Sequence, residues 1–475
     1  MNLQTVVSHL IEEKRDKMIE LSDKIWECPE IYFEEHQSSE YLCKALEAEG
    51  FQVEKNVAGL ETGFIGSYGT GKPIIAILGE FDALSGLSQK KGLAEHAPVV
   101  SGGHGHGCGH NLLGTGSFAA AVAVKDYMEQ TGLKGTVRYY GCPAEEAGSG
   151  KAFMARAGLF DDVDLAFSWH PSTIPSIWNV STLANYSATF IFNGKSAHAA
   201  AAPHLGRSAL DAVELMNVGV NYLREHMIPE ARVHYAITDT GGTSPNVVQP
   251  HAEVVYLIRA PKKQQVTELY ERVYDIARGA ALMTGTTMEV EFEGTASNLI
   301  PNTTLAEIMY KNLTAVGVPT YDEFDKLFAK KIRATLSQGD IDADLAGVDK
   351  ETAKKLKDKA ITEIIPPLGD EAALSGSTDV GDVSWVVPTM QCLTTCFALG
   401  TPLHTWQVVS QGAMPIAHKG MLQAGKVIAC TAIEAMQNQV IIEKAKAEWK
   451  ERLEGESYVS LIPENVVPPQ KEARV

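Results

Sequence analysis

The sequence has few cysteines, few aromatic residues and a deficit of basic side chains, and it lacks long apolar runs. Its seven cysteines, an odd number in 475 residues, do not form a disulfide framework. Lysine and arginine number 41 against 59 aspartates and glutamates, and the net charge of −18 argues against nucleic acid or an anionic membrane as a partner. No apolar run approaches the roughly 20 residues that span a bilayer. The N-terminal segment has the pattern of a charged amphipathic helix and not of a signal peptide, so we expect a cytoplasmic protein.

The length and composition are those of a globular protein with more than one domain. A chain of 475 residues is too long for one ordinary core, so two or three domains are expected. Between residues 185 and 298 the patterns follow the order β-α-β-β-α-β, which is typical of a ferredoxin-like α+β domain. We therefore predict that residues 185–298 are inserted into a first domain formed by residues 1–184 and 299–475. Residues 320–372 are charged, with few apolar positions, and are predicted to form a surface excursion.

The most unusual stretch is residues 101–111, Ser-Gly-Gly-His-Gly-His-Gly-Cys-Gly-His-Asn, in which glycine separates three histidines and one cysteine. A thiolate and imidazoles are ligands for transition metals, and glycine lets the backbone come close to a bound ion. The apolar run of residues 112–123 predicts a buried helix with Asn111 as its N-cap. The alternative is a flexible loop with one buried thiol.

Polar side chains also follow four short apolar segments that read as buried strands, at residues 72–79, 136–141, 164–169 and 390–400. The residues that follow them are Glu80 and Asp82, Glu145 and Glu146, His170, and His404. Helical segments separate these strands, which predicts an α/β fold. In open α/β sheets the ligand site lies beyond the carboxyl ends of the strands. We therefore expect these side chains to meet at one edge of the sheet.

Five of these side chains form a candidate metal site: Cys108, His110, Glu146, His170 and His404. They supply ligands for one divalent ion or for two, with two favoured and the cysteine placed to be shared. Each has a structural alternative, because Cys108 could be a small buried side chain, His170 a strand cap and His404 a hydrogen-bonded loop histidine. Their joint occurrence at predicted strand ends favours the metal site.

The adjacent carboxylates of Glu145 and Glu146 are costly to keep charged after a buried strand unless one of them binds a cation. If Glu146 is the ligand, Glu145 is free to act as a general base toward a water molecule activated by metal. The alternative is a solvated acidic turn. Glu80 and Asp82 are candidates either for orienting metal-binding imidazoles or for capping their strand.

The inserted domain contributes three further candidates. His198, in Gly-Lys-Ser-Ala-His, and Asn246, in Thr-Ser-Pro-Asn, could donate hydrogen bonds to a developing oxyanion. Arg259, at the end of an apolar strand, could bind a substrate carboxylate in bidentate fashion. Each could instead satisfy only the polar groups of its own domain.

The motifs Gly-His-Gly-Cys-Gly-His-Asn, Pro-Ala-Glu-Glu, Trp-His-Pro, Gly-Lys-Ser-Ala-His-Ala and Leu-His-Thr-Trp, in this order, resemble the M20 family of metallopeptidases and amidohydrolases, in its aminoacylase/carboxypeptidase-like branch. The resemblance implies an α/β, mixed-sheet, exopeptidase-like catalytic domain with an inserted α+β lid and dimerisation domain. It implies a dinuclear Zn or Mn centre held by the five ligands, with Glu145 as general base. It also implies that His198 enters the partner's site, where Asn246 and Arg259 help to bind substrate.

The same resemblance implies hydrolysis of an amide that joins an aroyl or acyl group to an amino acid, with p-aminobenzoyl-glutamate as the expected substrate. Two enzymatic alternatives remain: an aminoacylase or dipeptidase with a different pocket, or a subunit that is active only with a related A-type subunit. A homodimer formed through the lid is the other expected assembly. A structural or regulatory protein with a degenerate site is disfavoured, because Glu145 and all five ligands are intact.

Overall fold

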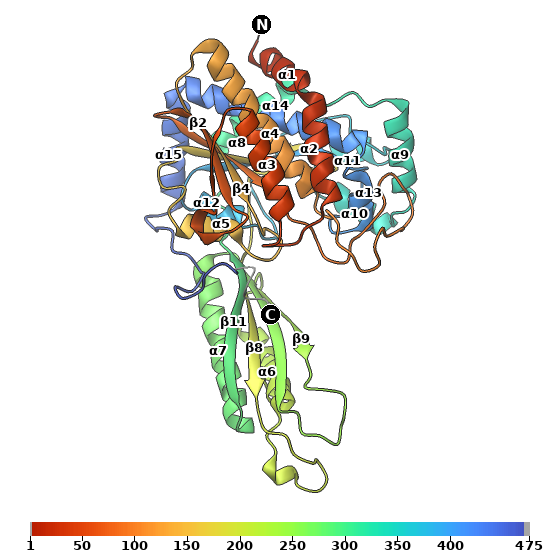
Figure 1. The fold of residues 1–475 in the computed structure, drawn as a ribbon, viewed down its shortest axis with the longest axis vertical. Coiled ribbons are helices and arrows are strands. Elements are labelled where there is room, and N and C mark those ends of the chain that lie inside the picture. The colour runs from red at the N-terminus through yellow and green to blue at the C-terminus, as the bar shows by residue number, and fades with distance from the viewer. Residues whose placement is uncertain (1, 470–475) are drawn as a thin grey trace.

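The structure is a computed structural model that describes residues 2–469. Figure 1 shows a large domain, which holds most of the helices, and a narrow domain that projects from it. The chain enters the narrow domain at β8 (Ala184–Asn193) and leaves it at the end of β11 (Thr287–Ala296). The large domain is therefore assembled from segments on both sides of this insertion.

A seven-stranded mixed sheet runs through the large domain in the order β1-β2-β4-β3-β5-β13-β6. Its strands are β1 (Gln52–Lys55), β2 (Phe64–Thr70), β3 (Ile74–Glu80), β4 (Gly135–Cys142), β5 (Leu165–Ser172), β6 (Ser176–Ile177) and β13 (Thr389–Thr395). The four apolar segments predicted as strands form β3, β4, β5 and β13, which are parallel neighbours. Their carboxyl ends therefore lie at one edge of the sheet, as predicted.

Alternate residues of β3 face two different cores. Ile75 and Ile77 belong to the larger core, and Ile74 and Leu78 belong to a smaller core on the other face. Helices on the larger core are α1 (Leu3–Glu13), α2 (Arg15–Glu27), α3 (His36–Ala48), α4 (His110–Thr131), α8 (Thr303–Val316), α14 (Pro415–Gln437) and α15 (Gln439–Arg452). Those on the smaller core are η1 (Val57–Gly59), α5 (Gly150–Arg156) and α12 (Val380–Ser384). The short α13 (Trp406–Gln411) follows His404.

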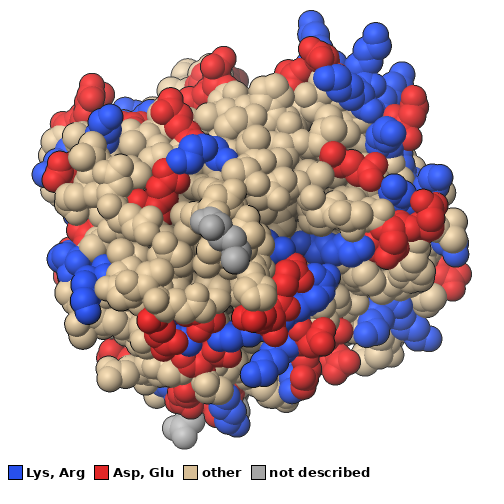
Figure 2. Space-filling model, turned by 90° about the horizontal axis from the view of Figure 1, so that it is seen from above, with Lys and Arg blue, Asp and Glu red and all other residues tan. Residues whose placement is uncertain are grey.

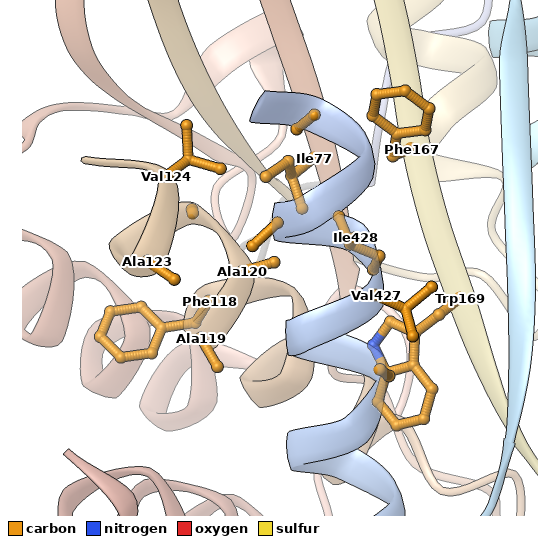
Figure 3. Close-up of a cluster of buried hydrophobic side chains, with 14 of the residues drawn as sticks. Ile77, Phe118, Ala119, Ala120, Ala123, Val124, Phe167, Trp169, Val427 and Ile428 are labelled. Carbon is orange, nitrogen blue, oxygen red and sulfur yellow. The ribbon is translucent and has the colours of Figure 1, made fainter. Parts of the chain in front are cut away.

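The packing of α4 against α14 and the sheet fixes one end of the predicted metal site. Figure 3 shows Ala119 and Ala120 of α4 beside α14, with Ile77 of β3 and Phe167 of β5 close by. Small side chains let the two helices approach closely, since a Cβ atom on Gly425 of α14 would lie 3.0 Å from the Cβ of Ala119. Each fully buried apolar side chain stabilises the fold by about 1.5–3 kcal/mol. The first turn of α4 is therefore held firmly in place.

The predicted N-cap of α4 is wrong. The helix begins at His110 and its N-cap is Gly109, so Asn111 lies inside the first turn. Gly109 adopts a left-handed conformation with φ of +82°, which turns the chain into the helix two residues earlier than the N-cap pattern suggests. The Asn111 amide instead donates to the Gly412 carbonyl oxygen at 3.0 Å and to Ser22 Oγ at 3.2 Å. It anchors the helix to neighbouring segments.

The narrow domain has the predicted element order. Its strands are β8, β9 (Arg232–Asp239), β10 (His251–Ala260) and β11, and its helices are α6 (Ala209–Leu223) and α7 (Lys263–Thr284), with the short η2 (Pro203–Leu205) and η3 (Arg224–His226). The antiparallel sheet has the order β11-β8-β10-β9, and α6 and α7 share one core with it. This α+β insertion into a mixed-sheet α/β domain confirms the predicted fold class. We call the inserted unit the lid domain.

The predicted surface excursion is helical and firmly attached. It contains α9 (Glu323–Arg333), α10 (Gln338–Leu345) and α11 (Lys350–Leu356). Phe328 and Ile332 of α9 are buried against the large domain, as are Ile341 and Leu345 of α10. After it, β12 (Ala372–Ala373) pairs in parallel with β7 (Val180–Ser181). The excursion therefore packs against the large domain near the end of β13.

Surface charge and apolar segments agree with the composition. Figure 2 shows the end of the large domain away from the lid, where Lys and Arg are interspersed with Asp and Glu. None of the helices in residues 2–469 combines the length and apolar character that a bilayer-spanning segment needs. The cysteines are free thiols, as their number and spacing predict.

Candidate metal centre

The carboxyl-end edge of the sheet brings the five predicted ligands together. One ligand atom each of Cys108, His110 and His170 lies within 4.8 Å of the other two, and the same holds for Cys108, Glu146 and His404. We call these groups the His170 triad and the His404 triad. Because Cys108 belongs to both, the five side chains form two adjoining triads that share one thiol.

Asp82 orients one residue of each triad. Its Oδ1 accepts a hydrogen bond from His110 Nδ1 at 2.7 Å, and its Oδ2 accepts one from the backbone N–H of Glu146 at 2.9 Å. A carboxylate on one imidazole nitrogen fixes the ring and directs the other nitrogen to a metal. Of the two roles that the sequence left open for Asp82, the structure shows the orientation of an imidazole.

His170 is oriented by its own backbone neighbour. Its Nδ1 donates to the Pro171 carbonyl oxygen at 2.8 Å, so its Nε2 carries the free lone pair. This Nε2 lies 3.3 Å from Cys108 Sγ. Both nitrogens of the ring therefore have a defined direction before any ion binds.

The glycine-rich stretch positions both Cys108 and His404. The backbone N–H of His404 donates to the Gly107 carbonyl oxygen at 2.8 Å, and His404 itself has a φ of +61°. Its Nε2 lies 3.3 Å from Glu146 Oε2. Gly109 is required because a Cβ atom there would lie 2.8 Å from Pro171 Cγ and its φ is +82°. Glycine is needed here for close approach of β5 and not for flexibility.

The residues present fit a pair of divalent cations. Glu146 Oε1 is buried and has no hydrogen-bond partner in the described chain, and the buried His110 Nε2 faces the Glu80 carboxylate at 3.3 Å without a hydrogen bond. A buried polar atom left without a partner costs about 1–3 kcal/mol, which a bound cation would offset. A thiol, three imidazoles and a carboxylate are a donor set typical of Zn and other divalent transition metals.

The surroundings shift the pKa values of the two adjacent glutamates, Glu145 and Glu146, in opposite directions. Burial first, and then the Glu80 and Glu146 carboxylates, raise the pKa of Glu145 well above its usual range. Burial opposes the charge of Glu146, but its hydrogen bond with His404 and the nearby His110 lower its pKa below the usual value. Glu146 is therefore the carboxylate that stays ionised, and Glu145 is the one that more readily accepts a proton.

A buried lysine beside the triads, Lys151, was not predicted from the sequence. Lys151 Nζ lies 2.7 Å from Glu80 Oε1 and 2.5 Å from Asp379 Oδ1, and all three side chains are buried. Although burial opposes its charge, Asp379 and Glu80 raise the pKa of Lys151 well above its usual range. Glu80, which lies 3.3 Å from His110 Nε2, is thus already paired with a cation. No local pattern marks Lys151, because Asp379 is 228 residues away in the chain.

Glu35 was also missed, and it supports the turn before Glu145. Its Oε1 accepts a hydrogen bond from the backbone N–H of Ala144 at 2.8 Å, and its Oε2 accepts one from Thr62 Oγ1 at 3.0 Å. Ala144 has a φ of +59°, which is unfavourable for a residue with a Cβ atom. Burial and the nearby Asp82 raise the pKa of Glu35 to about 8. Nothing in the sequence around Glu35 signals this contact.

Arg259 lies in a cavity of about 380 Å³ between the two domains. Glu145, Glu146 and His404 line it from the large domain, and Asn185 and Arg259 line it from the lid. This size and mixture of groups suit a small ligand. The lid residue predicted to bind a carboxylate therefore shares a cavity with the candidate base and with two predicted metal ligands. We call it the Arg259 cavity.

His198 and Asn246 do not reach the triads of their own chain. Neither residue lines the Arg259 cavity, and both are exposed. His198 Nδ1 accepts a hydrogen bond from the Ala200 N–H at 3.2 Å, and the Asn246 carbonyl oxygen accepts one from the Ala199 N–H at 3.0 Å. Their loops follow β8 and precede β10, at the end of the lid away from the large domain (Figure 1).

Residues 76–390 match the family described as Peptidase family M20/M25/M40, and the chain belongs to this family. It is accordingly a hydrolase that acts on amide bonds. The family and the donor set of the two triads support divalent metal ions as cofactors.

Two relatives and one solved structure match nearly the whole chain. It is 50% identical over 470 residues to the B subunit of p-aminobenzoyl-glutamate hydrolase of Escherichia coli (strain K12), covering 97% of this chain and 98% of that protein. It is 30% identical over 466 residues to Xaa-Arg dipeptidase of Mus musculus, covering 95% and 93%. The structure of a dinuclear metal binding peptidase of the M20 family from Bacillus subtilis matches with a TM-score of 0.53 and 18% identity, covering 90% of this chain and 99% of that chain. This last likeness shows the fold.

Proposed function

We propose that this chain hydrolyses the amide bond between an aroyl or acyl group and an amino acid, with p-aminobenzoyl-glutamate as its principal substrate. The observation that carries the proposal is the pair of triads that share Cys108, two of whose residues line the Arg259 cavity. The 50% identity to one subunit of a p-aminobenzoyl-glutamate hydrolase supports this substrate. The products are p-aminobenzoate and glutamate. We propose that this reaction is a step in folate catabolism and that it takes place in the cytoplasm.

Each triad would hold one divalent ion, and Zn and Mn are the proposed metals. When bound, such ions lower the pKa of water and polarise a carbonyl oxygen. Asp82, the Pro171 carbonyl oxygen and the Gly107 carbonyl oxygen hold the ligand side chains in place beforehand. The ligands thus need little reorganisation on binding.

Glu145 is the proposed general base. Its carboxylate lies within 4.8 Å of His110 and Glu80 but belongs to neither triad that shares Cys108. It takes a proton from the attacking water and returns it to the nitrogen of the leaving amino acid. Arg259 binds the carboxylate of that amino acid through its guanidinium group, which suits a planar anion. Glu35 supports the turn that presents Glu145.

We infer that His198 and Asn246 act on the site of a second copy of this chain, which dimerises through the lid. Strand β9 is an edge of the lid sheet and seven of its eight residues are exposed. Helix α6 also exposes Val218 and Tyr222, which are 52% and 67% exposed. An open strand edge, together with exposed apolar side chains on the same domain, is suited to pairing with a second copy.

Mixing two inactive variants tests this assembly. We expect Glu145→Gln and His198→Ala dimers to be inactive separately but to regain about a quarter of wild-type activity after they are dissociated and mixed. Half of the mixed dimers are hybrids, and each hybrid has one site with both Glu145 and a partner's intact His198. Turnover of p-aminobenzoyl-glutamate measures the recovery, and mixing Glu145→Gln with itself is the control. No recovery in verified hybrids would contradict action between chains.

A second candidate assembly is a heteromer. It is supported by the Escherichia coli relative, which is the B subunit of its hydrolase. In this assembly, a related A-type subunit supplies the groups that reach the site in place of His198 and Asn246. Hydrolysis by the purified chain alone distinguishes the two assemblies, because only the homodimer has complete sites without a partner.

A substrate comparison tests the proposed function itself. We expect kcat/KM for p-aminobenzoyl-glutamate to exceed the values for N-acetyl-glutamate and for an Xaa-Arg dipeptide by at least about tenfold, since one pocket difference commonly changes selectivity by that factor. The identity to Xaa-Arg dipeptidase makes the dipeptide the critical competitor. A preference for the dipeptide would replace the proposed substrate while leaving amide hydrolysis in place.

A further inference from the structure

A second cavity, of about 320 Å³, opens beside His170 and shares no lining residue with the Arg259 cavity. Trp178, Phe397 and Leu403 line it from the large domain, and Ala343 lines it from α10. Phe397 is fully buried, whereas Leu403 is 41% exposed. We call this the α10 cavity. It has the size of a small-molecule site, and its large-domain walls carry apolar side chains.

The α10 wall is fixed to the large domain. Asp344 Oδ1 accepts a hydrogen bond from Thr173 Oγ1 at 2.7 Å, and its Oδ2 accepts one from the backbone N–H of Gly400 at 2.6 Å. Ile341 and Leu345 of α10 pack in a core that also contains Leu399. The cavity is therefore a formed feature of the fold.

The two cavities flank the triads. His170, a member of one triad, lines the α10 cavity, while Glu146 and His404, members of the other, line the Arg259 cavity. Leu403 and His404 are adjacent in the chain, so the two cavities meet at this loop. An amide bond held at the triads can therefore place its two substituents in different cavities.

We propose that the α10 cavity binds the aromatic ring on the acyl side of the substrate, and that helix α10 gives the enzyme its selectivity for aroyl groups. This inference rests on the proposed function and deepens it. The Trp178 and Phe397 rings and the Leu403 side chain supply apolar contacts for a ring. Asp340 lies on the α10 side, and only its Oδ2 accepts hydrogen bonds from Ser337, so its carboxylate favours a ring substituent that donates, such as an amino group.

Filling the cavity from α10 tests the proposal. Ala343 is exposed and lines the cavity, so Ala343→Phe adds a ring there without disturbing the core. We expect the ratio of kcat/KM for p-aminobenzoyl-glutamate over N-acetyl-glutamate to fall at least about tenfold. The matched control is Ala346→Phe, at an exposed position at the end of the same helix that does not line the cavity. Its ratio should stay at the wild-type value.

Binding gives a second readout that does not depend on turnover. In a Glu145→Gln background, titration calorimetry should show that Ala343→Phe raises the Kd for p-aminobenzoyl-glutamate at least about tenfold, while Ala346→Phe leaves it unchanged. If the wild type hydrolyses p-aminobenzoyl-glutamate but Ala343→Phe changes neither the ratio nor the Kd, the inference is overturned and the proposed function stands. If the wild type hydrolyses neither substrate, either alone or together with an A-type subunit, the proposed function itself is overturned, and this inference with it.

Discussion

Replacing Glu145 with glutamine should reduce turnover of p-aminobenzoyl-glutamate by about a thousandfold while the bound metal stays at the wild-type amount. Glutamine keeps the size of the side chain but cannot take a proton from water, and general base catalysis typically contributes 10²–10⁴-fold. The metal should be retained because Glu145 belongs to neither triad that shares Cys108. Steady-state kinetics and elemental analysis of the same sample measure both quantities.

A matched control separates this role from a general effect of charge. Glu54→Gln removes a carboxylate at an exposed position of β1, far from the triads in the fold, and should leave turnover unchanged. Turnover of Glu145→Gln within tenfold of the wild type would remove Glu145 from the mechanism. Loss of metal from this variant would instead show that Glu145 is a ligand.

Replacing Cys108 with alanine should have the second large effect, the loss of both metal ions. Each triad contains this thiol, so its removal leaves each site with two ligands from the triads. His170→Ala and His404→Ala each alter only one triad and should each lower the metal content by about one ion per chain. Elemental analysis after dialysis measures these contents, and activity should be lost in all three variants.

Another buried thiol provides the control for Cys108. Cys43 is 1% exposed and lies in the core that contains α3, so Cys43→Ala should keep its full metal content. Two ions retained per chain in Cys108→Ala would show that the thiol is not shared between the ions.

The buried strands, and the position of their carboxyl ends at one edge of the sheet, were predictable because the sequence patterns that mark them are local. Continuous apolar runs mark strands buried on both faces, as in β3 and β5, and parallel strands place their carboxyl ends together. The Asp82 contact with His110 follows from the same geometry. The sequence does not indicate the order β4-β3-β5-β13, since β5 pairs with β3 and with β13 although neither strand is next to β5 in chain order.

The missed features depend on contacts between distant segments. Lys151 pairs with Asp379, and Glu35 holds Ala144, through contacts that no spacing along the chain reveals. The N-cap of α4 was misplaced because close packing of Gly109 against Pro171 outweighs the local preference of Asn111. The role of residues 320–372 was open in the sequence, and the buried face of α10 places this segment beside His170.

Titration of the metal-free chain with Zn²⁺ or Mn²⁺, while p-aminobenzoate release is measured, tests the central claim most directly. We expect no hydrolysis of p-aminobenzoyl-glutamate before metal is added and a rate that rises until two ions are bound per chain. Hydrolysis by the fully metal-free chain, or saturation of the rate at one ion per chain, would contradict a centre built on two triads that share Cys108.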